Sequence, residues 1–128
     1  MLTTVLVPAV VLVDKNKIIL MTTLPSRIKL SGFWEFPGGK VECGENSCQT
    51  AVRELKEEIL VRVNEIDLEL FDTLKHNYDG LNFEIAVFIS HNWKGHIKPQ
   101  KNQLYNCFEL HEIDYNKILP ANAKIIKK

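Results

Sequence analysis

The chain has 128 residues, of which 45% are hydrophobic and 25% charged, and its 16 basic and 16 acidic residues give a formal net charge of zero. This length suits a single domain over residues 1–128 with a core of its own, and zero net charge provides no overall field that would attract nucleic acid. Cys43, Cys48 and Cys107 are odd in number and form no Cys-X-X-Cys pair, so we expect neither a disulfide scaffold nor a zinc site.

The first part of the chain predicts a hairpin. Residues 3–13 are β-branched and almost continuously apolar, which indicates a strand buried on both faces rather than a signal peptide or a membrane span. A turn at residues 14–17 and a second strand over residues 18–23 complete the hairpin. The odd number of cysteines without a Cys-X-X-Cys pair favours a reducing compartment, so we expect a cytoplasmic protein. We also expect no membrane contact, and a monomer or a weak dimer.

A polar loop over residues 24–32 and an aromatic segment over residues 33–37 lead to the pair Gly38-Gly39. A helix should begin at Asn46 or Ser47, since Gln49 lies three residues after Asn46, as in a capping box. Its apolar residues recur at helical spacing and should pack on the core: Cys48, Ala51, Val52, Leu55 and Ile59.

Three carboxylates share a second face of this helix. Glu54, Glu57 and Glu58 stand at positions i, i+3 and i+4, with Glu58 nearest the apolar stripe and Glu57 farthest from it. Their mutual repulsion calls for a positive partner, either Arg53 or Lys56 nearby or a divalent cation. Oxygen ligands suit Mg²⁺, with Mn²⁺ as a second candidate, whereas the alternative is an ordinary solvated face with salt bridges.

The remainder of the chain predicts more strands than helices. Residues 67–76 and 81–90 form a second hairpin, joined at residues 77–80 by an Asp-Gly step. A short strand over residues 105–110 and a short helix over residues 111–119 follow.

The spacing around the acidic helix resembles a known signature. The chain reads Gly39, five residues, Glu45, seven residues, then Arg53-Glu54-Leu55-Lys56-Glu57-Glu58, which resembles the Nudix box of hydrolases acting on nucleoside diphosphates linked to another group. The resemblance implies the Nudix fold, an α/β (α+β) domain with a mixed β-sheet sandwiched between helices. One position departs, because Leu60 stands where the family has a glycine that favours a left-handed helix end.

Within the family, GFWEFPGGKVECGE is similar to the MutT branch, whose members sanitise nucleotide pools by converting 8-oxo-dGTP to 8-oxo-dGMP and pyrophosphate. Asn122, in the tail Leu-Pro-Ala-Asn, matches the asparagine that reads the edge of the oxidised guanine. An amide can donate and accept together, as a purine edge requires, although an asparagine in a turn is the ordinary alternative.

The resemblance also implies roles for the box. Glu54, Glu57 and Glu58, with the Gly38 carbonyl, would hold Mg²⁺ at a nucleoside triphosphate. Glu54 or Glu57 would accept the proton of the attacking water, and Arg53 would orient a glutamate through a charge-assisted hydrogen bond.

Residues around the box are candidates for supporting roles. Glu45 would support the helix start or the metal network. Lys40 and Arg27 could meet phosphate and Phe36 could stack on a base, whereas solvated cations and a core aromatic are the alternatives.

Three departures from MutT weaken the assignment of the base. Leu24 and Leu81 stand where MutT has arginines, and Lys101 falls near a glutamate that assists the metals in MutT. We therefore keep open a Nudix hydrolase for CTP, a dinucleotide polyphosphate or a nucleotide sugar. A catalytically silent binding module, the remaining alternative, would be expected to lack box carboxylates that this chain retains.

Overall fold

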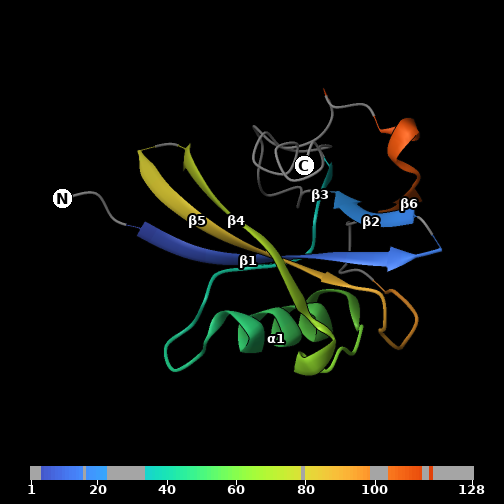
Figure 1. The fold of residues 1–128 in the computed structure, drawn as a ribbon, viewed down its shortest axis with the longest axis horizontal. Helices are drawn as coiled ribbons and strands as arrows, with labels where there is room; N and C mark the ends of the chain where they lie inside the picture. The colour runs from blue at the N-terminus through green and yellow to red at the C-terminus, as the bar shows by residue number, and fades with distance from the viewer. Residues whose placement is uncertain are drawn as a thin grey trace.

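The computed structural model describes residues 4–15, 17–22, 34–78, 80–98, 104–113 and 116. In this part of the chain one mixed sheet of six strands packs against one α-helix, which confirms the α/β class (Figure 1). The elements in chain order are β1 (Thr4–Asp14), β2 (Lys17–Thr22), β3 (Trp34–Glu35), α1 (Ser47–Ile59), the 3₁₀ turn η2 (Glu65–Asp67), β4 (Glu69–Tyr78), β5 (Leu81–Ser90), β6 (Tyr105–Phe108) and the 3₁₀ turn η3 (Leu110–Glu112).

Strand β1 is the centre of the sheet, whose order is β3-β2-β1-β5-β4 with β6 also paired to β2. It runs parallel to β5, with Thr4 opposite Asn82 and Leu12 opposite Ser90, and pairs antiparallel with β2 only at its end. Parallel neighbours need a long crossover, and α1 lies within this one. The antiparallel β1–β2 and β4–β5 pairings confirm both predicted hairpins.

The bounds of the predicted strands agree with the structure to within two residues, and the remaining differences have physical reasons. Strand β4 begins at Glu69 rather than at residue 67, because residues 65–67 form a 3₁₀ turn. Strand β3 was not predicted, since two residues carry no periodicity. Of the helix expected over residues 111–119, the first residues lie in η3, and most of the remainder lies outside the described residues.

Two hydrophobic clusters cover the two faces of the sheet. Along β1 the side chains alternate, so that Val10 and Leu12 join the cluster under α1 while Ala9 and Val11 join the cluster on the opposite face. Residues 8–12 of β1 are therefore buried on both faces, as the sequence predicted, whereas the other residues of the strand are exposed or half-buried. Ala51, Leu55 and Ile59 of α1 are all completely buried in the first cluster.

The segment that carries the glycine pair is fixed to the free edge of β1. The amide of Val10 donates to the carbonyl of Pro37 (2.9 Å), and the amide of Val41 donates to the carbonyl of Leu6 (3.1 Å). Between them, Gly38 forms an isolated antiparallel bridge with Ala9. The glycine turn is therefore attached to the strand that α1 packs against.

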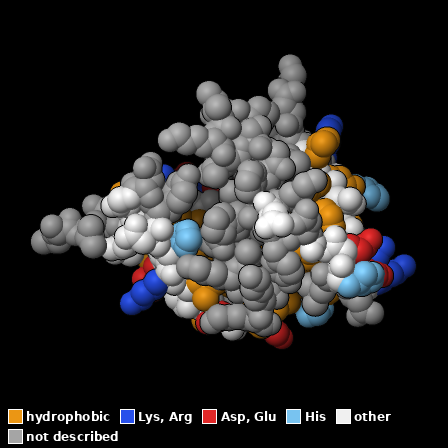
Figure 2. Space-filling view, turned by 90° about the horizontal axis from the view of Figure 1, so that it is seen from above, with side chains coloured by type: hydrophobic (Ala, Val, Ile, Leu, Met, Phe, Trp, Pro, Cys, Tyr) orange, Lys and Arg blue, Asp and Glu red, His pale blue; other side chains and the backbone are white. Residues whose placement is uncertain are grey.

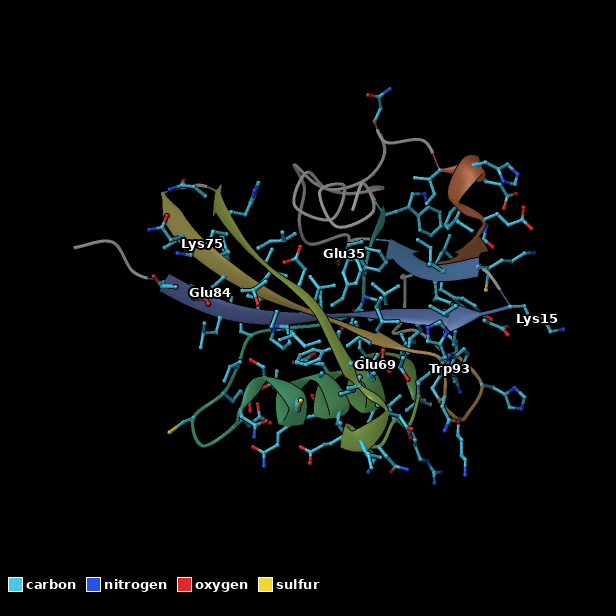
Figure 3. The ribbon with its side chains drawn as sticks, in the orientation of Figure 1. Lys15, Glu35, Glu69, Lys75, Glu84 and Trp93 are labelled. Carbon is cyan, nitrogen blue, oxygen red and sulfur yellow. The ribbon has the colours of Figure 1, made fainter. Side chains whose placement is uncertain are left out.

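A loop after β5 holds the far end of α1. The amide of Lys98 donates to the carbonyl of Ile59 (2.9 Å), and Arg62 and Lys94 exchange two backbone hydrogen bonds of 2.9 Å. Trp93 lies at the end of β1, where its Nε1 donates to the carbonyl of Val13 (3.2 Å; Figure 3).

The described charged side chains on the face opposite α1 lie around its rim, with both signs interspersed (Figure 2). Among the described residues, none of the helices combines the length and apolar character that a membrane span requires.

Candidate active site

Helix α1 begins as its sequence predicts. Asn46 is the N-cap in an extended conformation, and its side-chain Oδ1 accepts a hydrogen bond from the amide of Gln49 (2.8 Å). The Gln49 side chain in turn accepts from the amide of Asn46 (3.0 Å), which completes the capping box. This cap fixes the start of the helix and so the direction in which the following carboxylates project.

The acidic face of α1 lies next to the apolar face of the helix, which is buried in the core. The side chain of Glu54 is 20% exposed and that of Glu57 is 60% exposed, while Glu58 is half-buried. This order agrees with the helical geometry, which sets Glu57 farthest from the core.

Arg53 lies at the centre of the cluster and uses all of its donors. Its Nε and one Nη2 hydrogen bind the two oxygens of Glu45 at 2.7 and 3.0 Å. Its Nη1 binds Oε1 of Glu54 (2.9 Å) and Oε2 of Glu57 (3.1 Å), and its Nη2 also donates to the main-chain carbonyl of Lys40 (3.3 Å). Because a guanidinium has five N–H groups in a rigid fork, Arg53 joins the glycine turn to the acidic face of α1.

Glu45 is the principal partner of Arg53. Besides the two arginine hydrogen bonds, its Oε1 accepts from the Thr50 hydroxyl (2.8 Å) and from the amide of Glu42 (3.2 Å). The hydrogen bond from Arg53, followed by those from Thr50 and Glu42, lowers the pKa of Glu45 from 4.5 to about 2, although burial opposes the shift. The same contact with Glu45 raises the pKa of Arg53 above its usual value. The pair is therefore ionised at neutral pH.

The two glycines of the turn are each required by a different neighbour. A Cβ on Gly38 would lie 2.2 Å from the carbonyl oxygen of Pro8, which belongs to the backbone of β1. A Cβ on Gly39 would instead lie 2.4 Å from Cδ of Glu54. Gly38 thus allows the turn to approach the sheet, and Gly39 leaves room for a box carboxylate.

Leu60 ends α1 in the left-handed conformation, with φ 57° and ψ 30°. It does so even though it is a leucine at the position where the resembled signature has a glycine. Its amide donates to the carbonyls of Leu55 and Lys56, and the amide of Val61 also donates to Leu55 (3.1 Å). The departure at this position therefore leaves the form of the helix end intact.

The family model described as NUDIX domain matches residues 3–128. The chain belongs to the Nudix family. It is a Nudix hydrolase with the MutT-like box that its sequence indicated. A relative from Proteus vulgaris named 8-oxo-dGTP diphosphatase is 34% identical over 95 residues, which cover 74% of this chain and 83% of the relative.

Another relative matches part of the sequence of this Nudix hydrolase, and a solved structure matches its fold. The CTP pyrophosphohydrolase of Escherichia coli is 42% identical over 48 residues, which cover 38% of this chain and 36% of that protein. The crystal structure of the MutT NUDIX hydrolase from Burkholderia pseudomallei superposes with a TM-score of 0.84 at 19% identity, covering 98% of this chain and 97% of that one. The latter likeness supports the Nudix fold.

The box of this Nudix hydrolase offers carboxylate and carbonyl oxygens, which are the ligands that a hard divalent cation prefers. Arg53 contacts one oxygen of Glu54 and one of Glu57, and the second oxygen of each carboxylate is outside these contacts. The bridge to β1 uses the Pro37 carbonyl and the Gly39 amide, and so does not use the Gly38 carbonyl. Within the described residues, no three His, Cys, Asp or Glu side chains are close enough together to hold a metal ion as they stand.

The predicted substrate residues have different surroundings. Phe36 is only 5% exposed and packs in the second core cluster, in line with the packing alternative. Trp34 is half-buried and meets Phe108 edge to face, with ring centroids 5.1 Å apart. Lys40 is exposed, and Leu81 is 37% exposed at the start of β5. The predictions for Arg27, Asn122, Leu24 and Lys101 fall outside the described residues.

Two groups of the site were not predicted from the sequence. The Lys40 carbonyl is a backbone group, which residue types do not reveal. The Thr50 hydroxyl could have been noticed, because Thr50 is three residues before Arg53 and therefore near it on the helix surface.

Proposed function

We propose that this Nudix hydrolase is a Mg²⁺-dependent nucleoside triphosphate pyrophosphohydrolase that sanitises the nucleotide pool by converting 8-oxo-dGTP to 8-oxo-dGMP and pyrophosphate. The observation that supports the chemistry best is the cluster in which Arg53 binds Glu45, Glu54 and Glu57 beside the glycine turn. The substrate is suggested by the printed name of the Proteus relative, whose match extends over most of both chains.

We assign two roles to the carboxylates of the acidic face, metal binding and proton transfer. Glu54, Glu57 and Glu58, with the carbonyl of Gly38, would hold Mg²⁺, which when bound neutralises phosphate charge and lowers the pKa of the attacking water. Glu54 or Glu57 would accept the proton from that water. Arg53 would orient both carboxylates through its charge-assisted hydrogen bonds.

The substrate contacts are proposed at the surfaces next to the box. Lys40 is exposed at the glycine turn, where an ammonium group can meet phosphate. Trp34 offers an accessible aromatic ring, and Phe36 would support that surface from the core. Arg27 and Asn122 remain proposals from the motif for phosphate and base, respectively.

We further propose a cytoplasmic monomer or weak dimer that does not bind nucleic acid. Cys43, Cys48 and Cys107 are all free thiols, which suits a reducing compartment. A zero formal charge gives no general attraction to a polyanion.

The substrate is tested by a Mg²⁺-dependent pyrophosphate-release assay with 8-oxo-dGTP, dGTP, CTP and dATP. A kcat/KM for 8-oxo-dGTP well above that for dGTP would support the sanitising role, and equal or reversed values would end it. Higher kcat/KM for CTP would favour the second candidate, for which the partial match to CTP pyrophosphohydrolase is the motivating observation. Absence of release from every nucleotide would favour a binding module.

Glu57→Gln tests the proposed use of the acidic face. We expect kcat to fall at least about a hundredfold, because a metal ligand and candidate general base is lost while the side-chain volume is kept. Glu69→Gln, the same change at an exposed glutamate of β4 outside the box sequence, is the matched control and should leave kcat unchanged. Full activity of Glu57→Gln would remove Glu57 from the mechanism.

A further inference from the structure

Thr50 is a buried polar residue on the face of α1 that carries Arg53. Its side chain has no exposed surface, and Oγ1 lies 2.8 Å from Oε1 of Glu45 and 3.1 Å from the carbonyl of Asn46. Both neighbours are acceptors, whereas the hydroxyl has one proton. The proton therefore goes to the nearer and negatively charged oxygen, where the hydrogen bond is stronger.

We propose that Thr50 is a positioning residue of the active site, acting through Glu45 on Arg53. The Thr50 hydroxyl fixes the Glu45 carboxylate, which holds Nε and Nη2 of Arg53 at 2.7 and 3.0 Å. The opposite corner of the same guanidinium then presents Nη1 to Glu54 and Glu57. The activity readout of this inference rests on the proposed hydrolase function.

The physical need for Thr50 arises from the flexibility of a glutamate. The terminal torsion of a glutamate side chain is broad, so Glu45 held by Arg53 alone could turn with the guanidinium. The amide of Glu42, its other donor, lies in an exposed turn. A β-branched threonine in a helix has few rotamers, and burial restricts Thr50 further. Thr50 therefore supplies, from helix α1, a hydrogen-bond donor whose position is fixed.

Thr50→Val and Thr50→Ser separate positioning from packing. Valine keeps the volume and loses the hydroxyl, whereas serine keeps the hydroxyl and loses a methyl group. We expect Thr50→Val to lower kcat for pyrophosphate release about tenfold, as loss of a supporting hydrogen bond typically does, with KM changed less than about twofold. Thr50→Ser should retain most of the activity. The reverse order, or a wild-type kcat for Thr50→Val, would overturn the inference.

A double-mutant cycle tests the route through Glu45. If Thr50 acts through that carboxylate, adding Thr50→Val to Glu45→Gln should lower kcat by less than about twofold, and a full additional tenfold loss would contradict the route. Thr50→Ala and Thr50→Ser form a second matched pair, which differ only in the hydroxyl, if the valine variant fails to fold.

The Arg53 Nε–H signal in a ¹⁵N–¹H NMR spectrum gives a readout that does not depend on catalysis. Its exchange with water should accelerate in Thr50→Val and stay slow in Thr50→Ser, and equal exchange in both variants would overturn the inference. Wild-type protein that releases no pyrophosphate from any nucleotide would end the proposed function, while this signal would still decide the role of Thr50.

Discussion

Glu45 shows how one residue outside the acidic face of α1 can fix the geometry of that face. Its carboxylate accepts hydrogen bonds from Arg53, Thr50 and the amide of Glu42, and its side chain is 18% exposed. Arg53 cannot lose its charge at neutral pH, and neither can a carboxylate with this pKa. The geometry of the acidic face therefore depends on a permanent ion pair.

The acid stability of the fold should depend on this ion pair. Because folding lowers the pKa of Glu45 from 4.5 to about 2, its contribution is complete above the unfolded value and is lost as pH falls toward the folded value. We expect the free energy of unfolding, measured with urea, to decrease across this window, and to decrease less steeply in Glu45→Gln. Parallel pH curves for the two proteins would contradict this expectation.

Gly38 and Gly39 are neighbours whose substitution by alanine should have different consequences. The Gly38→Ala methyl group meets the backbone oxygen of Pro8, so the turn must move away from β1 and stability should fall by about 1–3 kcal/mol, as for an overpacked site. The Gly39→Ala methyl group meets the flexible end of Glu54, which can swing away. We expect Gly39→Ala to lower kcat at nearly unchanged stability; thermal unfolding and pyrophosphate release distinguish the two variants.

At the scale of the element, α1 combines a favourable start with a strained end. The capping box of Asn46 and Gln49 satisfies backbone donors at the first turn. At the other end, Leu60 adopts a left-handed conformation that L-residues avoid, and its side chain is 52% exposed, so little burial compensates. The loop at Gly95 and Lys98 holds this end, with the Lys98 amide on the Ile59 carbonyl.

Leu60→Gly should therefore stabilise the protein. Relief of the left-handed strain outweighs the added freedom of the unfolded chain, and we expect the free energy of unfolding to rise by about 1 kcal/mol. Lys56→Gly is the matched control, because a glycine inside α1 should cost about 1 kcal/mol. Urea denaturation measures both changes, and a loss of stability in Leu60→Gly would show that its side chain contributes more than its exposure suggests.

At the scale of the whole molecule, β1 connects the parts that form the site. It pairs with β5 on one edge, holds the glycine segment on the other, and packs against α1. Trp93 adds a link from the loop after β5 to the end of β1 through its hydrogen bond to Val13 (Figure 3). The acidic face of α1 is thus supported by contacts from segments that are far from it in the sequence.

Trp93→Phe should weaken this support without touching the box. The phenyl ring keeps much of the apolar contact, whereas the Val13 carbonyl loses its indole donor. We expect a loss of about 1 kcal/mol, which corresponds to a fall in Tm of roughly 3–5 °C for a domain of this size. An unchanged Tm would indicate that water replaces the indole donor.

Local patterns in the sequence determined much of this protein. The strand over residues 81–90 and the capping box at Asn46 agree with prediction, because a hairpin turn signal and helix capping depend on neighbours along the chain. The spacing from Gly39 to Glu58 indicated the Nudix family for the same reason. One helix turn suffices to bring Glu54, Glu57 and Glu58 onto one face.

Only the tertiary structure decided how distant parts meet. The parallel pairing of β1 with β5 and the bridge from Gly38 to Ala9 join segments that no periodicity relates. The burial of Phe36 and the meeting of Arg53 with the Lys40 carbonyl likewise depend on distances in space. Side-chain types state which contacts are chemically favourable, whereas the fold determines which groups come within reach.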